Sequence, residues 1–179
     1  MLTSPRITRV RAISASERSQ WTGLLCETVA GGASVGFLAP LEAATAARYW
    51  ASAIEDVVAG SRVLLALRRG DRLVATVQLA LPWQPNAAHR AEVQKLIVHP
   101  AERRRGHARR LLAAIEERAA ALGRTLLVLD TQRDDPAELL YRAAGYTYVG
   151  SIADYAAGAD GVLRANAIYC KRLTETVSA

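Results

Sequence analysis

Arginines gather around a single glycine in the stretch VHPAERRRGHARRLL, which follows an apolar segment and opens a pattern typical of a helix. Where a strand turns into a helix, free main-chain N–H groups and the positive end of the helix dipole meet. Gly106 would let a ligand approach the main chain of this turn, and Ala108 is small enough to allow the same. The arginines, which could add charge-assisted hydrogen bonds, are Arg103, Arg104, Arg105, Arg109 and Arg110. These residue types in this order favour a binding site for phosphate groups.

The alternative interpretation is a solvated basic surface at the start of a helix. Cations at that end oppose the helix dipole, so these arginines would destabilise the helix unless an anion offset their charge. The stretch lacks the G-x-x-x-x-G-K-[ST] spacing of a Walker loop and the repeated glycines of a dinucleotide-binding turn. We therefore expect a phosphate site of another kind.

Two carboxylates near this turn could accept a proton or bind a substrate ammonium group. Two-residue alternation along the preceding strand would place Glu92 and Gln94 on the same face as Leu96. Asp130 ends the apolar stretch LLVLD, and ligands of open α/β sheets gather beyond such strand ends. Glu92 could instead pair with a neighbouring cation, and Asp130 could cap the helix that follows. The sequence leaves open which carboxylate is the general base.

The hydrophobic pattern changes period repeatedly along the chain and so predicts the elements that position these residues. Strands are expected over 7–13, 91–100, 124–131, 146–152 and 167–173, with a hairpin over 62–81 that turns at Gly70 and Asp71. Helices are expected over 17–30, 41–59, 104–122 and 136–145. The strand over 124–131 is apolar enough to be covered on both faces. This order predicts an α/β fold with a mixed sheet of six to seven strands and helices on both faces.

Composition narrows the class of protein. The chain has 179 residues, of which 51% are hydrophobic, and we expect a single domain over 1–179. It lacks a signal segment and an apolar run of the roughly 20 residues that span a bilayer, so a cytoplasmic location without membrane contact is expected. Cys26 and Cys170 lie far apart, which favours reduced, buried thiols and no metal site. The net charge of +6 suits anionic ligands, whereas only 6% aromatic residues argue against a nucleic-acid platform.

The arginine-rich turn resembles motif A of the GCN5-related N-acetyltransferases, V-x-P-x-x-R-x-x-G-x-G/A, with Arg103, Gly106 and Ala108 on the patterned positions. Ala108 stands where the family usually has a second glycine. The stretch AELLYRAAGY is similar to the family's following motif, in which a tyrosine, here Tyr141, lies four residues before the helix-ending glycine, here Gly145. The resemblance covers nearly the whole chain and implies a mostly antiparallel sheet of the family's type.

The resemblance also implies acetyl-coenzyme A as the acetyl donor and assigns residues to it. Turn amides would hold its pyrophosphate, and the preceding strand would pair with its pantetheine arm. The cofactor-binding residues implied are Leu96, Ile97, Val98, Arg103, Arg104, Arg105, Gly106, His107, Ala108 and Arg109. The loop GGASVGF corresponds to the family's acceptor loop, which implies substrate contacts for Gly31, Gly32 and Ser34. The catalytic candidates are Glu92, Asp130 and Tyr141, and Tyr141 would protonate the departing thiolate.

The expected function is acetyl transfer to an amine, rather than a hydroxyl, of a small molecule by direct transfer in a ternary complex. The segments ETVAGGASVGF, RAEVQKLIVHP, LLVLDT and AIYCKRL resemble family members that acetylate a β-lactam toxin, which suggests a toxin or an amino-acid-like compound as acceptor. The alternatives are an acetyltransferase for protein amino termini or lysines, and a non-catalytic acyl-coenzyme A sensor. The protein is expected to be a monomer or a homodimer, without a nucleic-acid partner.

Overall fold

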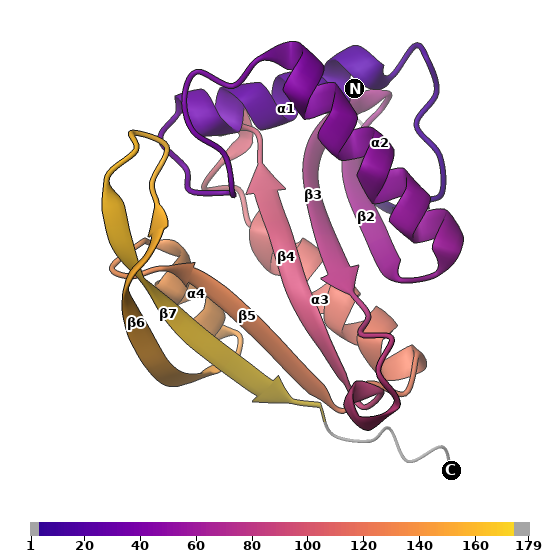
Figure 1. The fold of residues 1–179 in the computed structure, drawn as a ribbon. Helices are drawn as coiled ribbons and strands as arrows, with labels where there is room; N and C mark the ends of the chain where they lie inside the picture. The colour runs from indigo at the N-terminus through magenta and orange to yellow at the C-terminus, as the bar shows by residue number, and fades with distance from the viewer. Residues whose placement is uncertain (1–3, 174–179) are drawn as a thin grey trace.

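Seven strands form one sheet in the order β1-β2-β3-β4-β5-β7-β6 in the computed structural model, which describes residues 4–173 (Figure 1). The strands are β1 (Arg6–Val10), β2 (Arg62–Arg69), β3 (Arg72–Ala80), β4 (Arg90–Val98), β5 (Leu126–Gln132), β6 (Thr147–Ala157) and β7 (Leu163–Arg172). The helices are α1 (Arg18–Ala30), α2 (Ala43–Ala59), α3 (His107–Ala121) and α4 (Ala137–Ala143), with short 3-10 helices at Pro85–Ala87 and Pro100–Glu102. Every neighbouring pair of strands is antiparallel except β4 and β5. The predicted element order and mixed, mostly antiparallel sheet are confirmed.

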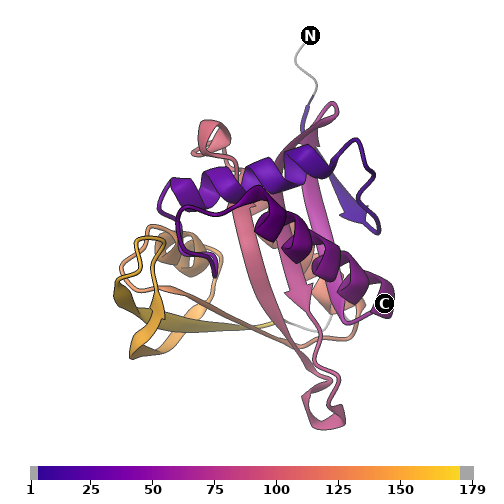
Figure 2. The same ribbon diagram turned by 45° about the horizontal axis from the view of Figure 1, so that its top comes forward.

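Helices cover both faces of the sheet and divide the core into two apolar clusters (Figures 1 and 2). On one face, Leu111, Leu112 and Ile115 of α3 pack with Tyr141 of α4 against the strands. On the other face, residues of α1 and α2, including Trp21, pack over the sheet. Both clusters follow from the 3.6-residue spacing of apolar side chains along the helices. The prediction of helices on both faces is therefore confirmed.

Helix α3 begins at His107, three residues later than the apolar pattern predicts. Arg104 and Gly106 have φ angles of 61° and 77°, in the left-handed region that interrupts a right-handed helix. The predicted start at Arg104 is therefore wrong, because a tight turn occupies these residues. The first N–H groups of α3 point out of the N-terminal end of the helix, on the side of this turn.

Strand β5 is not covered on both faces as its composition predicts. Leu127 and Leu129 are buried in the cluster beneath α3, whereas Leu126 and Val128 are only partly buried. Helices α1 and α2 lie over β2 to β4 and leave this part of the sheet uncovered (Figure 2). An apolar stretch alone does not distinguish a strand between two helical layers from one that borders a cavity.

Strands β4 and β5 diverge after a short parallel ladder (Figure 1). Residues Arg90–Glu92 pair with residues Leu126–Val128, and no pairing between the two strands follows. Ile97 and Val98 still pair with β3 on their other side. The last residues of β4 therefore have one edge inside the sheet that no strand pairs with, and the site described below lies at this edge.

Within residues 4–173, no helix combines the length and apolar character that crossing a bilayer requires. Cys26 and Cys170 are both free and only partly buried, whereas full burial was expected. No group of three or more His, Cys, Asp or Glu side chains in the same residues is arranged to hold a metal ion.

Candidate active site

Two adjoining cavities lie where β4 and β5 diverge. The first has a volume of about 650 Å³ and extends from the arginine-rich turn along the end of β4. The second, of about 360 Å³, extends between β4 and β5 toward β7. Leu96 and Tyr141 line both cavities and mark where they meet. A ligand in the first cavity could therefore reach a ligand in the second.

The turn before α3 forms one end of the first cavity. The first helical hydrogen bond runs from the Arg110 amide to the Gly106 carbonyl oxygen (3.1 Å), so the three preceding N–H groups of α3 have no helical acceptor. Most of the predicted cofactor-binding residues line this cavity: Leu96, Ile97, Val98, Arg103, Arg104, Gly106, His107, Ala108 and Arg109. Their main-chain N–H groups and guanidinium groups together can bind a phosphorylated ligand.

Arg105 and Arg110 pair with protein groups and do not line the first cavity. Arg105 does not line the cavity, and its Nη1 lies 3.3 Å from a carboxylate oxygen of Glu102. Arg110 donates a hydrogen bond from Nη2 to the carbonyl oxygen of Pro5 (2.9 Å). The dense positive charge of the sequence is thus divided between the cavity and protein partners.

Glu102 is a buried carboxylate that sequence reasoning missed. Its side chain is 4% exposed and lies 3.1 Å from Arg69, 3.5 Å from Arg72 and 3.6 Å from Nε2 of the buried His107. Burial acts to raise the pKa of Glu102, but Arg105, Arg69, His107 and Arg72 together hold that pKa below its ordinary value. Glu102 thereby fixes the turn to the β2–β3 hairpin. The side chain of His107 belongs to this cluster, so its main chain is what the turn offers to a ligand.

The second cavity brings together Glu92, Asp130 and Tyr141, the three predicted catalytic residues. Asn166 of β7 donates a hydrogen bond from Nδ2 to Oδ2 of Asp130 (2.5 Å). Gln94 donates from Nε2 to Oε1 of Glu92 (2.7 Å). Each carboxylate is therefore oriented by an amide side chain and keeps an oxygen available to a ligand.

A β-bulge at Lys95 changes the face to which β4 residues point. Lys95 has a φ angle of 48°, and the register with β3 shifts here. Leu96 packs against the cluster beneath α3, whereas Gln94 accepts a hydrogen bond from Nη1 of Arg62 (3.0 Å), and Arg62 also pairs with α2. The prediction that Glu92 and Gln94 share a face with Leu96 is wrong, because the extra residue of a bulge breaks two-residue alternation.

Lys95 and Asn166 are two further residues of the second cavity that sequence reasoning did not assign. A lone lysine in a strand and a lone asparagine near the C-terminus have no motif around them. Only the structure shows that they line the cavity. The bulge directs Lys95 into it, and the pairing of β5 with β7 brings Asn166 to Asp130.

The predicted acceptor loop is divided between the two cavities. Gly31 and Gly32 line the first cavity, together with the guanidinium of Arg103 close to Gly31. Ser34 lines the second cavity. The loop therefore covers the junction between the cavities from the α1 side.

Tyr141 is buried at the junction of the cavities, within the apolar cluster of α3 and α4. Burial, with added repulsion from Asp135 and Asp130, raises the pKa of Tyr141 to about 12. Its hydroxyl consequently keeps its proton at neutral pH and can donate it to a basic atom that forms at the junction.

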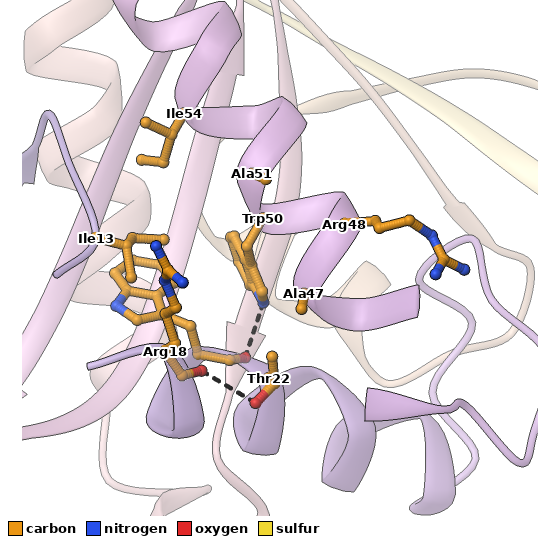
Figure 3. A pocket seen from close by; sticks show the side chains of 9 residues that line it. Ile13, Arg18, Thr22, Ala47, Arg48, Trp50, Ala51 and Ile54 are labelled. Carbon is orange, nitrogen blue, oxygen red and sulfur yellow. Dashed lines mark hydrogen bonds between the residues drawn. The ribbon is translucent and has the colours of Figure 1, made fainter. Parts of the chain in front are cut away.

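A third cavity, of about 500 Å³, lies between α1 and α2 (Figure 3). Trp50 of α2 donates a hydrogen bond from Nε1 to the main-chain oxygen of Trp21 (2.8 Å), and Thr22 Oγ1 donates to the oxygen of Arg18 (3.0 Å). None of the predicted site residues lines this cavity.

Comparison with known proteins gives matches to acetyltransferases. The model of the acetyltransferase (GNAT) family matches residues 31–146. An uncharacterized N-acetyltransferase in the hisH-hisA intergenic region of Azospirillum brasilense is 30% identical over 140 residues, or 75% of this chain and 82% of that protein. A crystal structure of an N-acetyltransferase from Staphylococcus aureus Mu50 has a TM-score of 0.79 at 14% identity and covers 96% of this chain and 100% of its own. A putative acetyltransferase from Salmonella typhimurium, solved with its cofactor acetyl-CoA, has a TM-score of 0.74 at 14% identity and covers 98% of both chains.

Proposed function

Because the chain belongs to the GNAT acetyltransferase family, we propose that it transfers an acetyl group from acetyl-coenzyme A to an amine of a small molecule in a ternary complex. The observation that carries this proposal is the junction of two cavities, one lined by a phosphate-binding turn and the other by two carboxylates. Tyr141 lies where the cavities meet. Donor and acceptor sites that adjoin in this way suit direct transfer.

The residues of the first cavity fit acetyl-coenzyme A. The unpaired N–H groups at the start of α3, with Arg103, Arg104 and Arg109, would hold its phosphates. No strand pairs with the outer edge of Ile97 and Val98, where the Val98 oxygen accepts only a long hydrogen bond from Nε of Arg103 (3.4 Å). This edge offers main-chain hydrogen bonds to an extended, amide-containing arm. A Cβ atom added to Gly106 would have no neighbour within 4 Å, so the turn leaves open space for a ligand.

Acetyl-coenzyme A, when bound, would supply a thioester carbonyl that a neutral amine can attack. Asp130 or Glu92 would take up the proton that the amine loses as the C–N bond forms, directly or through water. As the C–S bond breaks, the hydroxyl of Tyr141 would give its proton to the departing sulfur. The amide partners Asn166 and Gln94 hold the carboxylates in place for this step.

Replacing Gly106 by alanine is expected to weaken acetyl-coenzyme A binding about tenfold or more. Alanine in the left-handed region costs about 1–2 kcal/mol, so the turn relaxes and no longer aims its N–H groups at the phosphates. The measurement is a calorimetric titration with the cofactor. The control is Gly123→Ala, since Gly123 also has a positive φ, of 71°, but lies at the far end of α3. Equal affinities in the two variants would contradict the phosphate site.

Asp130→Asn and Glu92→Gln are expected to have different kinetic effects. Loss of the general base should lower kcat by a factor of about 10²–10⁴, whereas loss of the carboxylate that only binds the acceptor should mainly raise its KM. Steady-state kinetics of thiol release distinguish the two effects. Glu117→Gln serves as a control because Glu117 is exposed on α3 outside both cavities. Unchanged kinetics in both variants would remove the carboxylates from the mechanism.

For the acceptor, the resemblance of four segments to the tabtoxin resistance protein supports a β-lactam toxin or an amino-acid-like compound. The decisive experiment is a cofactor titration combined with thiol release over a panel of amines, including a β-lactam amino acid and a peptide amino terminus. Binding with release on a small amine supports the proposal. Release on the peptide alone would favour a protein acetyltransferase, and binding without release would favour an acyl-coenzyme A sensor. Absence of cofactor binding would overturn the proposal.

A further inference from the structure

We propose that the acceptor carries an anionic group, such as a carboxylate, beside its reacting amine, and that Lys95 binds this group. The inference rests on the proposed function, because it specifies the chemical class of the acceptor.

The bulge in β4 directs Lys95 into the second cavity. A lysine at a φ angle of 48° is held in a conformation that side-chain-bearing residues rarely adopt, and such residues cluster at ligand sites. Its Nζ lies 3.5 Å from the position that a Cβ on Gly36 of the acceptor loop would take, and 6.0 Å from the ring centroid of Tyr49 on α2. The ammonium group therefore lies between the sheet and the loop that covers the cavity.

Lys95 differs in its pairing from Lys171, the only other lysine of the sequence. Lys171 donates from Nζ to Glu116 (2.6 Å) and to the main-chain oxygen of Ala144 (2.8 Å). Within the described part of the chain, Lys95 makes no ion pair shorter than 4.0 Å. Lys95 is partly buried, and a cation partly withdrawn from water without a partner is unfavourable, so an anion in the cavity would stabilise it.

The groups around Lys95 act on its charge in opposite directions. Burial lowers the pKa of Lys95, Asp130 and Glu92 act to raise it, and Arg62 acts to lower it, with a net decrease. A bound carboxylate close to Nζ would favour the charged form. The site thus gains a full ion pair only when the acceptor supplies the anion.

The second cavity is suited to a molecule with both charges. Asp130 and Glu92 line it and can receive an amine or ammonium group, while Lys95 provides the opposite charge. Its volume of about 360 Å³ lies within the usual range of about 300–1,000 Å³ for small-molecule sites. These features favour a compact amino acid over an amine without an anionic group.

The test compares amino acids with their carboxamides as acceptors, by thiol release with the wild-type protein, Lys95→Met, Lys95→Arg and Arg172→Met. We expect the wild type to prefer the acids at least tenfold in kcat/KM, because a hydrogen-bonded ion pair corresponds to a factor of roughly 10–100. Lys95→Met should lose this preference and Lys95→Arg should keep it. Arg172→Met removes one exposed charge at the end of β7 and should behave as the wild type.

Two outcomes would overturn the inference. One is that the wild-type protein acetylates carboxamides as efficiently as acids. This measurement does not depend on the folding of any variant. The other is a Lys95→Met variant that prefers acids over carboxamides as strongly as the wild type does. Calorimetric titration with acetyl-coenzyme A separates these results from failure of the proposed function, because either outcome can occur while the cofactor binds and amines are acetylated. A protein that binds no cofactor would overturn both proposals.

Discussion

Replacing Tyr141 by phenylalanine is expected to lower kcat by a factor of about 100 or more, because general acid catalysis contributes about 10²–10⁴. The substitution removes one hydroxyl at the junction of the two cavities and keeps the ring in the cluster beneath α3. Without this hydroxyl, the thiolate would leave unprotonated or would take its proton from water. Steady-state thiol release at saturating acceptor measures the effect, and cofactor titration confirms that the donor site is intact.

The pH dependence of Tyr141 provides a second measurement. Because burial raises the pKa of this hydroxyl to about 12, it stays protonated throughout the range in which the protein can be assayed. The wild-type kcat should therefore show no decline due to this group below about pH 11. Tyr148→Phe is the matched control, since Tyr148 lies on β6 outside both cavities. A Tyr141→Phe variant with the kcat of Tyr148→Phe would assign the proton donor elsewhere.

Replacing Glu102 by glutamine is expected to destabilise the protein by about 1–3 kcal/mol at pH 7 and to weaken cofactor binding. Glu102 is buried, but the side chains of Arg69 and Arg105 are 24% and 53% exposed, so solvent screens part of the charge that they would leave unpaired. Here Arg69, Arg105 and His107 would lose their common partner. The turn would then lose its attachment to the hairpin. Urea unfolding and cofactor titration measure the two effects.

The pH dependence of this destabilisation has a defined sign. The pKa of Glu102 is lowered in the folded protein, so its contribution to stability is complete above the ordinary value of 4.5 and is lost as the pH falls through the lowered pKa. The difference between wild type and Glu102→Gln should therefore be largest at neutral pH and shrink below about pH 4. Glu27→Gln, which removes an exposed partner of His99, should change stability by less than about 1 kcal/mol. A difference that does not depend on pH would contradict the role of the carboxylate charge.

The order of elements could be predicted from the sequence because the apolar residues of helices and those of strands recur with different periods. The spacing of Leu111, Leu112 and Ile115 indicates α3, and the paired apolar runs around Gly70 indicate the β2–β3 hairpin. The start of α3 could not be found in this way, since an apolar stripe does not show which residues take left-handed φ angles. Arg104 is such a residue without being glycine.

Residues of the site could be predicted only where they belong to one continuous stretch of the sequence. The arginine-rich turn is a continuous motif, and Asp130 ends the apolar stretch LLVLD, which forms most of β5. Glu102 could not be predicted, because Arg69 and Arg72 reach it from a hairpin about thirty residues earlier. The bulge at Lys95 could not be predicted either, since it arises from the pairing of β4 with β3. It inverts the two-residue alternation from which residues of β4 were assigned to faces of the sheet.

The divergence of β4 and β5 has a thermodynamic consequence for the whole chain. The ladder between β4 and β5 is limited to three residue pairs, from Arg90 with Leu126 to Glu92 with Val128. A donor molecule that pairs with the open edge of β4, as we propose, would complete the sheet and would bind only the folded chain. By mass action, a ligand present at 100 times its dissociation constant adds about 2.7 kcal/mol to the free energy of unfolding. A rise in the concentration of the acetyl donor would then stabilise the fold as well as speed the transfer.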